Sequence, residues 1–312
     1  MHPDRLPLRH FLLALAVVAV WGTNFVVIRL ALDHLPPLAF ATLRFFFALV
    51  PAVFFLPRPQ ASWRNLAAYG VLIGAGQFGL LYLAMRHDIA PGLASLVIQL
   101  QVFFTIGLAM ALTHERVQPF QLLALLLAVA GIVLIGLHTD ASAARGGTTT
   151  GLGLVMILLA ALAWAGGNTV SRRAGRIDML AYMVWSSLFA VLPLAALSLA
   201  FEGWPAIESG LRAADATTWA AVLWQSVGNT LFGYAAFGWL LSRHPAATIA
   251  PMSLLVPVFG MAASFVWLGE PLPPWKLVAA ALVIGGLALN VLWPRLAPRV
   301  ATLFGPTAWR QR

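Results

Sequence analysis

The sequence contains no cysteine and has few charged residues. Disulfides, thiolate metal sites and cysteine nucleophiles are therefore excluded. Charged residues make up 9% of the 312 positions, whereas about 25% is usual in soluble domains. Hydrophobic residues account for 61% of the chain. This composition does not fit a soluble protein with a polar shell, and it indicates an integral membrane protein.

Recognisable catalytic motifs are also missing. The sequence has no HExxH zinc motif, no Walker phosphate loop and no dinucleotide fingerprint following a strand. Serines inside the apolar runs, such as Ser186, Ser187 and Ser264, have no histidine close to them in the sequence. We therefore predict that the chain is not an enzyme, and that it carries no cofactor and no metal site.

Acidic residues are absent from the middle of every apolar run. None of the ten Asp and Glu residues lies there, and the histidines also stand at run ends. Because burying a charge in lipid is expensive, an intramembrane carboxylate would mark a functional site. Proton-driven exporters of cationic drugs usually keep such a carboxylate to exchange the cation for a proton. Its absence argues against that class of protein.

What the sequence does have is long apolar runs. A helix needs about 20 apolar residues to cross about 30 Å of hydrocarbon. In lipid such a run must be helical, because its backbone polar groups have to bond within the segment. We therefore predict an all-α integral membrane protein with ten transmembrane helices, at 11–31, 36–56, 65–85, 91–112, 118–137, 151–171, 179–201, 217–240, 245–268 and 274–293.

These runs form two copies of one unit. The stretch 102–131 recurs at 257–286: in each copy an apolar run ends at a single glutamate (Glu115, Glu270), a turn with a proline follows, and the next run holds a late glycine (Gly131, Gly286). We predict a first repeat at 11–137, a linker at 138–150, a second repeat at 151–293 and a tail at 294–312. An insertion near 202–217 is expected to form a short surface helix.

The odd number of spans in each repeat fixes their relative orientation. Five spans bring the second copy into the membrane from the opposite side, so we predict inverted repeats related by a pseudo-twofold axis in the membrane plane. With the N-terminus inside, 13 Lys and Arg residues fall in inner loops and 4 in outer loops. The formal charge of +9 therefore sets topology, with cytoplasmic termini. The predicted partner is the lipid bilayer, with no nucleic acid and no obligate protein partner evident.

Arg44 is a basic residue about two turns into the second run. One interpretation is an anchor for a substrate carboxylate at the outer mouth. The other is a side chain that snorkels to the headgroups or bonds carbonyls of a neighbouring helix. We expect the second, because long basic side chains near span ends normally snorkel.

Prolines predict a bend in the ninth run. Pro251 and Pro257 lie inside it, and each frees backbone carbonyls. Freed backbone is tolerated in a membrane only beside protein or a water-filled cavity. The equivalent fourth run has no interior proline, so we expect the pseudo-symmetry to be broken at the binding centre.

Neutral polar and aromatic side chains inside the runs are the candidate substrate contacts. Helix–helix bonding and core packing are the alternative roles for the same residues. Gln99 and Gln101 stand about 200° apart on a helix, so both cannot face one cavity squarely. The candidate substrate-binding residues are Trp21, Asn24, Phe78, Tyr82, Gln99, Gln101, Trp164, Asn168, Gln225, Asn229 and Tyr234.

The chain resembles the EamA unit of the drug/metabolite transporter superfamily. The resemblance covers about residues 11–293. It rests on WGTNFVVIR at 21–29, on Leu43–Arg44–Phe45, and on the two segments at Glu115 and Glu270. The whole chain looks most like the YddG-type exporters of aromatic and other amino acids. The resemblance implies ten spans, cytoplasmic termini, a central cavity, alternating access and a bacterial inner membrane.

The functional hypothesis is a secondary transporter that exports neutral or zwitterionic amino acids, aromatic and other hydrophobic ones, without a membrane carboxylate for proton coupling. Amides and hydroxyls would bond the carboxylate and the ammonium, and apolar walls would hold the side chain. The alternatives are an exporter of toxic organic cations or other small metabolites, and an integral membrane enzyme acting on lipids. Export and the amino-acid cargo follow from the resemblance alone.

Overall fold

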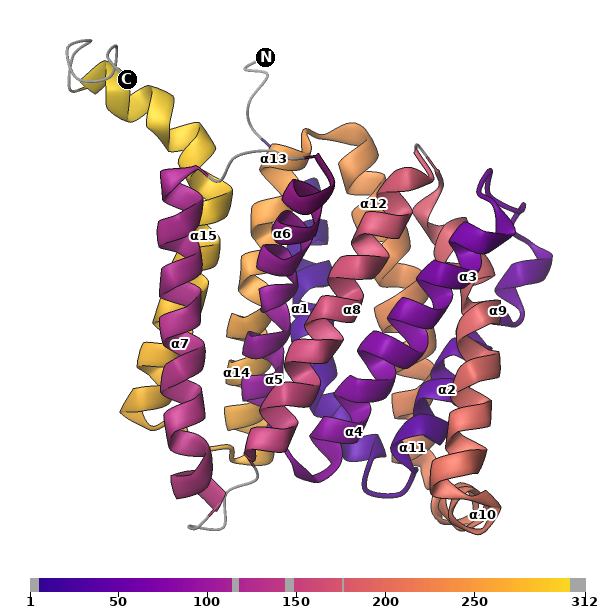
Figure 1. Cartoon of the computed structure of the whole chain (residues 1–312). Helices are drawn as coiled ribbons and strands as arrows, with labels where there is room; N and C mark the ends of the chain where they lie inside the picture. Colours follow the sequence, from indigo (N-terminus) through magenta and orange to yellow (C-terminus); the bar gives the residue numbers. More distant parts are fainter. Residues whose placement is uncertain (1–5, 114–117, 144–148, 176, 304–312) are drawn as a thin grey trace.

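The described residues form a bundle of helices that run side by side. The computed structural model describes residues 6–113, 118–143, 149–175 and 177–303, and within these ranges it contains helices and short connections but no strand. Helix α1 begins and helix α15 ends at one end of the bundle, named here the terminus end (Figure 1). The short helix α10 (Trp204–Ala213) lies at the opposite end, named the far end.

The first repeat contributes spans one to five, several of them built from consecutive helical elements. In chain order these are α1 (Leu8–Ala31); α2 (Pro37–Leu49) with η1 (Ala52–Phe54); α3 (Trp63–Val71), η2 (Leu72–Gly79) and α4 (Leu80–His87); α5 (Pro91–Val97), η3 (Ile98–Leu100) and α6 (Gln101–Thr113); and α7 (Pro119–Ala143).

The second repeat contributes spans six to ten. These are α8 (Gly151–Arg173); α9 (Met179–Leu197) with η4 (Ser198–Glu202); α11 (Ala216–Leu223), η5 (Trp224–Phe232) and α12 (Gly233–Arg243); α13 (Ala246–Ile249), η6 (Ala250–Leu255) and α14 (Val256–Leu268); and α15 (Pro274–Leu303). The surface helix expected near 202–217 is present as α10. The last helix continues to Leu303, beyond its membrane-spanning stretch Pro274–Pro294, which agrees with the predicted end of span ten at 293.

Nine helical runs in the described part of the chain are long and apolar enough to cross a membrane. Span eight, 216–243, is continuous helix but is not among the nine. Its middle carries the buried polar residues Gln225, Ser226, Asn229 and Thr230, which lower its mean hydropathy. The all-α membrane architecture is confirmed, and span eight is the span with a group of buried polar residues at its middle.

Helix starts follow local capping chemistry. Ser62, Thr150, Asp178 and Asp215 each accept a hydrogen bond from a backbone N–H in the first turn of the helix that follows. These side chains satisfy N–H groups that have no partner within the helix. The Thr150 N–H also donates to the carbonyl of Asp88 at 2.8 Å, which places the start of α8 at the far end. Since α1 starts at the terminus end, the equivalent first helices of the two repeats run in opposite directions (Figure 1).

The four spans three, four, eight and nine change their winding halfway along. The π-helical segments η2 and η5 interrupt spans three and eight, and the 3₁₀ segments η3 and η6 interrupt spans four and nine. Such mid-helix changes often mark hinges or functional positions. Span four adopts its 3₁₀ turn without a proline, but η3 has three residues that are all buried whereas η6 has six of which none is buried, so the two spans differ here.

Close helix packing relies on glycines. A Cβ on Gly286 would lie 2.5 Å from the Ala124 carbonyl oxygen, and one on Gly131 would lie 2.7 Å from Val283, so α7 and α15 pair tightly at one side of the bundle (Figure 1). In the far half of the bundle, a Cβ on Gly260 of α14 would lie 2.4 Å from the Ser95 Oγ on α5.

Span four is packed very differently along its two halves. Every residue from 91 to 100 is buried, whereas Thr105 is the one buried residue among positions 101–112. The far half of span four packs closely against α14 through Ser95 and Gly260. The terminus half of span four is more loosely surrounded.

Candidate functional site

Arg44 of α2 occupies the centre of a polar junction between three spans. Its side chain is fully buried, with 0% exposure. Nη1 donates to the Tyr82 hydroxyl at 3.1 Å, and Nε and Nη2 both donate to the Thr230 hydroxyl at 3.3 and 3.2 Å. Tyr82 belongs to span three, and Thr230 stands near the midpoint of span eight. One guanidinium therefore ties spans two, three and eight together deep inside the bundle.

Aromatic rings cover the faces of this junction. The Arg44 guanidinium carbon lies 3.5 Å from the centre of the Phe78 ring and 5.3 Å from that of Phe45. The Tyr82 ring stacks on Phe40 with centres 4.9 Å apart. Cation–π contact favours a cation over a ring face and leaves the N–H groups at the guanidinium edge free for hydrogen bonds.

The charge of Arg44 has no carboxylate partner in the described part of the chain. The ion pairs found there are Arg29–Asp33, Arg212–Glu208 and Lys276–Glu270, and none involves Arg44. The expectation that Arg44 snorkels is wrong, because its head bonds Tyr82 and Thr230 and stacks on Phe78 instead of reaching the headgroups. A buried charge without a counter-charge is costly even when it is hydrogen-bonded.

Several buried amides on spans one, three and eight lack hydrogen-bond partners in the structure. They include the amide nitrogen and oxygen of Gln225 (Nε2 and Oε1), the Oε1 of Gln77 and the Oδ1 of Asn24. Gln77 precedes Phe78, and the backbone carbonyl of Gln225 accepts the Thr230 hydroxyl at 2.9 Å, so two of the three lie on the segments that hold Arg44. Buried polar groups are rarely left unpaired without a reason. The unpaired atoms of Gln77 and Gln225 therefore remain available for further hydrogen bonds.

Trp21 of span one is held against span eight. Its Nε1 donates to the backbone carbonyl of Asn229 at 3.2 Å, and its ring tilts against Tyr234 and Phe237 with centres 6.0 and 5.0 Å apart. A Cβ on Gly233 would lie 2.4 Å from the Trp21 Nε1, so a glycine is needed for this approach. The predicted residues Trp21, Asn229 and Tyr234 are therefore neighbours.

A second polar group lies between spans four and six. The Asn168 amide donates to the Gln101 Oε1 at 2.9 Å and to the Thr105 hydroxyl at 3.3 Å. Gln99 faces another way and donates to the backbone carbonyl of Ser253 in span nine at 3.1 Å. The prediction that Gln99 and Gln101 face different neighbours is confirmed. Gln101 and Asn168 bond each other, which also fits the alternative role of joining helices.

Trp164, the repeat equivalent of Trp21, is partly buried on α8 and packs against the apolar core. The structure brings Phe78 and Tyr82 to Arg44, Trp21 to Asn229 and Tyr234, and Gln101 to Asn168, whereas Gln99 bonds span nine. The structure places Arg44 and Thr230 at the centre of the polar junction, and neither was among the predicted residues.

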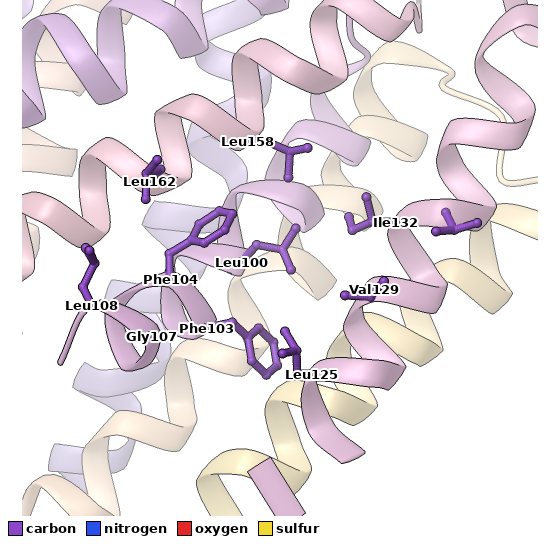
Figure 2. Close-up of a pocket in the computed structure, with 11 residues that line it drawn as sticks. Leu100, Phe103, Phe104, Gly107, Leu108, Leu125, Val129, Ile132, Leu158 and Leu162 are labelled. Atoms are coloured by element: carbon purple, nitrogen blue, oxygen red, sulfur yellow. The ribbon is translucent and has the colours of Figure 1, made fainter. Parts of the chain in front are cut away.

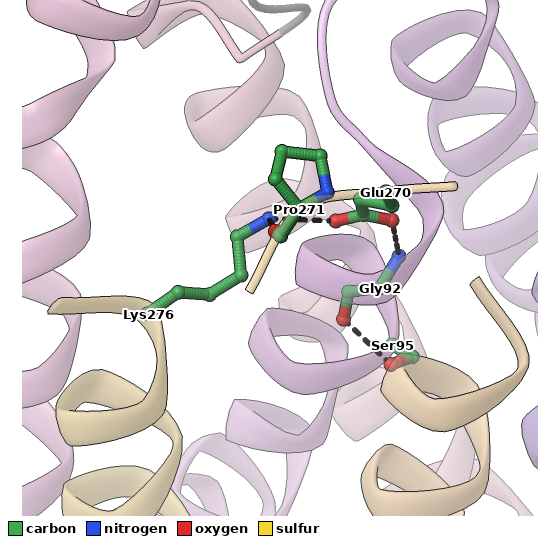
Figure 3. A network of polar contacts seen from close by, with 5 residues as sticks. All are labelled: Gly92, Ser95, Glu270, Pro271 and Lys276. Atoms are coloured by element: carbon green, nitrogen blue, oxygen red, sulfur yellow. Dashed lines mark hydrogen bonds and ion pairs between the residues drawn. The ribbon is translucent and has the colours of Figure 1, made fainter. Parts of the chain in front are cut away.

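A buried ion pair lies beside the start of span four, at the far end of the bundle (Figure 3). The Glu270 carboxylate accepts the Gly92 N–H at 2.9 Å and the Lys276 ammonium at 2.9 Å. Lys276 also donates to the Pro271 carbonyl, and Ser95 donates to the Gly92 carbonyl. Glu270 and Lys276 are 8% and 4% exposed. The carboxylate thereby joins the end of span nine to the start of span four in the other repeat.

A second carboxylate makes an analogous contact at span two. Glu202, at the end of span seven, accepts the backbone N–H groups of Leu38 and Ala39 at 2.7 and 3.0 Å. The Ser198 hydroxyl also donates to it at 2.6 Å. Negative charge is favourable at a helix N-terminus. Both far-end carboxylates therefore link one repeat to a helix start in the other.

An apolar groove of about 470 Å³ opens between α6, α7 and α8 (Figure 2). Its walls carry no polar side chain: they are formed by Leu100, Phe103, Phe104, Gly107, Leu108, Leu125, Val129, Ile132, Val133, Leu158 and Leu162. A polar molecule would lose its hydration here without compensating hydrogen bonds. The groove is therefore a poor site for a zwitterion, and the Arg44 junction is the better candidate.

Comparison with known proteins identifies the family. The model of the EamA-like transporter family matches residues 8–137 and 151–292. The chain belongs to the EamA-like transporter family. The resemblance that the sequence motifs indicated is thus confirmed, and this EamA-like chain is a multi-pass membrane protein.

Relatives of this EamA-like chain include two bacterial efflux proteins. A probable amino-acid metabolite efflux pump of Salmonella typhimurium is 40% identical over 89% of this chain and 93% of the relative. The protein of the same description in Escherichia coli is 36% identical over the same shares. A probable terminal-alkyne amino-acid exporter of Streptantibioticus cattleyicolor is 25% identical over 87% of this chain and 90% of the relative.

A solved crystal structure shares the fold of this EamA-like chain. It is 19% identical and superimposes with a TM-score of 0.62 over 92% of this chain and 97% of that one. At this identity the likeness shows the fold alone.

Proposed function

We propose that this EamA-like chain exports neutral or zwitterionic amino acids, or closely related metabolites, across a bacterial inner membrane. The observation that carries the proposal is its 40% identity to an efflux pump described as acting on amino-acid metabolites, over nearly the full length of both chains. The polar junction at Arg44 and the unpartnered amides of Gln77 and Gln225 support it, because they offer hydrogen bonds to a small polar molecule.

The proposed site lies where spans of the two repeats meet. Trp21, Asn24, Phe78 and Tyr82 come from the first repeat, and Gln225, Asn229 and Tyr234 come from the second. A midplane site at a repeat interface is the usual arrangement in transporters with inverted repeats. Aromatic rings would hold a hydrophobic side chain, which supports aromatic and other hydrophobic amino acids as cargo. Gln99, Gln101, Trp164 and Asn168 would border the path on the side of spans four and six.

In alternating access, the helices would separate at the far end while they pack together at the terminus end, and then the reverse. In the described conformation the far end is closed by Ser95 against Gly260 and by the contacts of Glu270. Release at that end requires α5 and α14 to separate. With the termini in the cytoplasm, as the charge bias of the loops favours, this structure corresponds to a state closed to the outside. No carboxylate lies in the middle of an apolar run of the sequence, so we propose flow down the amino-acid gradient.

Transport into vesicles tests the proposal. The purified protein would be reconstituted and the counterflow of labelled amino acids measured, with protein-free vesicles as the control. We expect flux of hydrophobic amino acids with or without a proton gradient. Absence of flux for every amino acid contradicts the cargo, and flux that disappears with the proton gradient contradicts the energetics. Organic cations are the second cargo class, and the unpaired charge of Arg44 disfavours them.

A further inference from the structure

We propose that Arg44 binds the carboxylate of the transported molecule, so that a free carboxylate is a requirement for transport. This inference rests on the proposed function and names a residue and a chemical group that the family assignment does not provide. It starts from the donors of the guanidinium. Three of its five N–H groups are engaged, by Tyr82 and by Thr230.

The remaining two N–H groups suit a carboxylate. One on Nη1 and one on Nη2 have no acceptor among the described residues. Phe78 covers the face of the guanidinium and leaves its edge available. A carboxylate can accept two parallel N–H bonds from one guanidinium, and such charge-assisted pairs are about twice as strong as neutral hydrogen bonds. The two acceptors that Arg44 has now are neutral hydroxyls, which leave its charge uncompensated.

The surroundings also provide for the other end of an amino acid. An ammonium group needs acceptors, and the amide oxygens of Gln77 and Gln225 are buried without partners. Gln77 adjoins Phe78, and the backbone carbonyl of Gln225 accepts a hydrogen bond from the Thr230 hydroxyl, so both residues belong to the segments that contact Arg44. Both segments are π-helical, a rare winding that is frequently found at functional sites. A cation binding site would instead need a carboxylate or an open aromatic face, and Phe78 is already occupied by Arg44.

The full burial of Arg44 has a consequence for the order of events. Because its side chain is 0% exposed, a carboxylate reaches it when spans three and eight, which Arg44 bridges, move apart. The entering carboxylate then compensates the charge that Tyr82 and Thr230 leave uncompensated. Substrate binding and the opening of this three-span junction are therefore one step.

The test compares four molecules that differ at the charged groups alone. L-phenylalanine has both charges; L-phenylalaninamide and phenethylamine lack the carboxylate; 3-phenylpropionate lacks the ammonium. The same series is prepared for leucine. Binding to purified wild-type protein is measured by thermal stabilisation, and transport by counterflow. We expect the two molecules without a carboxylate to bind about 10- to 100-fold more weakly than the amino acid, the range for a lost charge-assisted bond. Equal binding of the acid and its amide overturns the inference.

Variants separate binding from a structural role. In Arg44→Gln and Arg44→Lys we expect the preference for acid over amide to fall toward one, with Lys keeping part of it because it retains charge without the planar fork. Arg29→Gln, which removes an exposed cation paired with Asp33, is the matched control and should leave the preference unchanged. If Arg44 only holds helices together, its variants lower stability and leave the ratio as in wild type.

The two proposals fail in distinguishable ways. Carboxylate-dependent stabilisation that is lost in Arg44→Gln, without flux of any amino acid, refutes the proposed function and supports carboxylate binding at Arg44 alone. Flux of amino acids together with equal flux of their amides refutes the inference and supports the function. If Arg44→Gln does not fold, the comparison of acid and amide in the wild-type protein still decides.

Discussion

Replacing Glu270 by glutamine should open the far end of the bundle. The carboxylate accepts two charge-assisted hydrogen bonds, from the Gly92 N–H and from the Lys276 ammonium, both at 2.9 Å. A hydrogen bond to a charged group contributes about 1.5–3 kcal/mol and a neutral one about 0.5–1.5 kcal/mol. Loss of about 1 kcal/mol at each bond gives about 2 kcal/mol, or roughly 30-fold in the equilibrium between closed and open far ends.

Thiol labelling can measure this opening, because the chain has no native cysteine. Ser264 lies on α14, is 0% exposed, and its hydroxyl has no hydrogen-bond partner in the structure, so Ser264→Cys removes no contact. A water-soluble maleimide should modify this position about 30-fold faster when Glu270→Gln is added, the ratio estimated from the two lost charge-assisted bonds. The Lys276 ammonium would stay buried without its counter-ion, which acts in the same direction.

The matched control is Ser186→Cys on α9, which is 1% exposed, also has a hydroxyl without a partner in the structure, and lies on another helix. Its labelling should stay at the wild-type rate in the Glu270→Gln background. Faster labelling at both positions would mean that the variant loosens the whole bundle. An unchanged rate at position 264 would refute the idea that Glu270 holds the far end closed.

Three further predictions concern packing and capping. Gly260→Ala should lower the melting temperature and speed labelling at the far end, because the new Cβ would lie 2.4 Å from the Ser95 Oγ; Ser95→Gly in the same chain should reverse both effects. Gly286→Ala should lower the melting temperature by separating α7 and α15, and shortening a facing side chain should not rescue it because the clash is with a backbone oxygen at 2.5 Å. Hydrogen bonds from the backbone N–H and the hydroxyl of Thr218 lower the pKa of Asp215. The stabilisation from this cap should therefore be fully present above the ordinary carboxyl pKa of about 3.9 and be lost as the pH falls. Thermal melts at neutral pH should show Asp215→Ala destabilised, and Asp215→Asn destabilised much less.

The spans were predictable because their signal is additive. Each apolar run contributes many residues to one decision, so a few polar positions do not change it. Span eight is the limiting case. The amides and hydroxyls between Gln225 and Thr230 keep it out of the nine runs that are apolar enough to cross a membrane, yet the repeat still indicates a helix there. The 3₁₀ segment in span four could not be predicted from the sequence, because no proline marks its position.

The position of Arg44 could not be predicted in the same way. Its depth of about two turns is readable from the sequence, but snorkelling and burial use the same residue at the same depth. The deciding contacts come from Phe78, Tyr82 and Thr230, on spans three and eight. Thr230 adjoins Asn229, which was a predicted site residue, so the neighbourhood was indicated although the central group was not.

The change from α-helix to π- or 3₁₀-helix in spans three, four, eight and nine provides hinges near the middle of the membrane. A uniform α-helix moves as one rod, so displacing one tip displaces the other. Where η3 and η6 interrupt spans four and nine, the two arms of each helix can turn independently. Such a bundle can rebuild the seal in one leaflet while the other leaflet keeps its packing, and it does not need to swing whole repeats against the surrounding lipid.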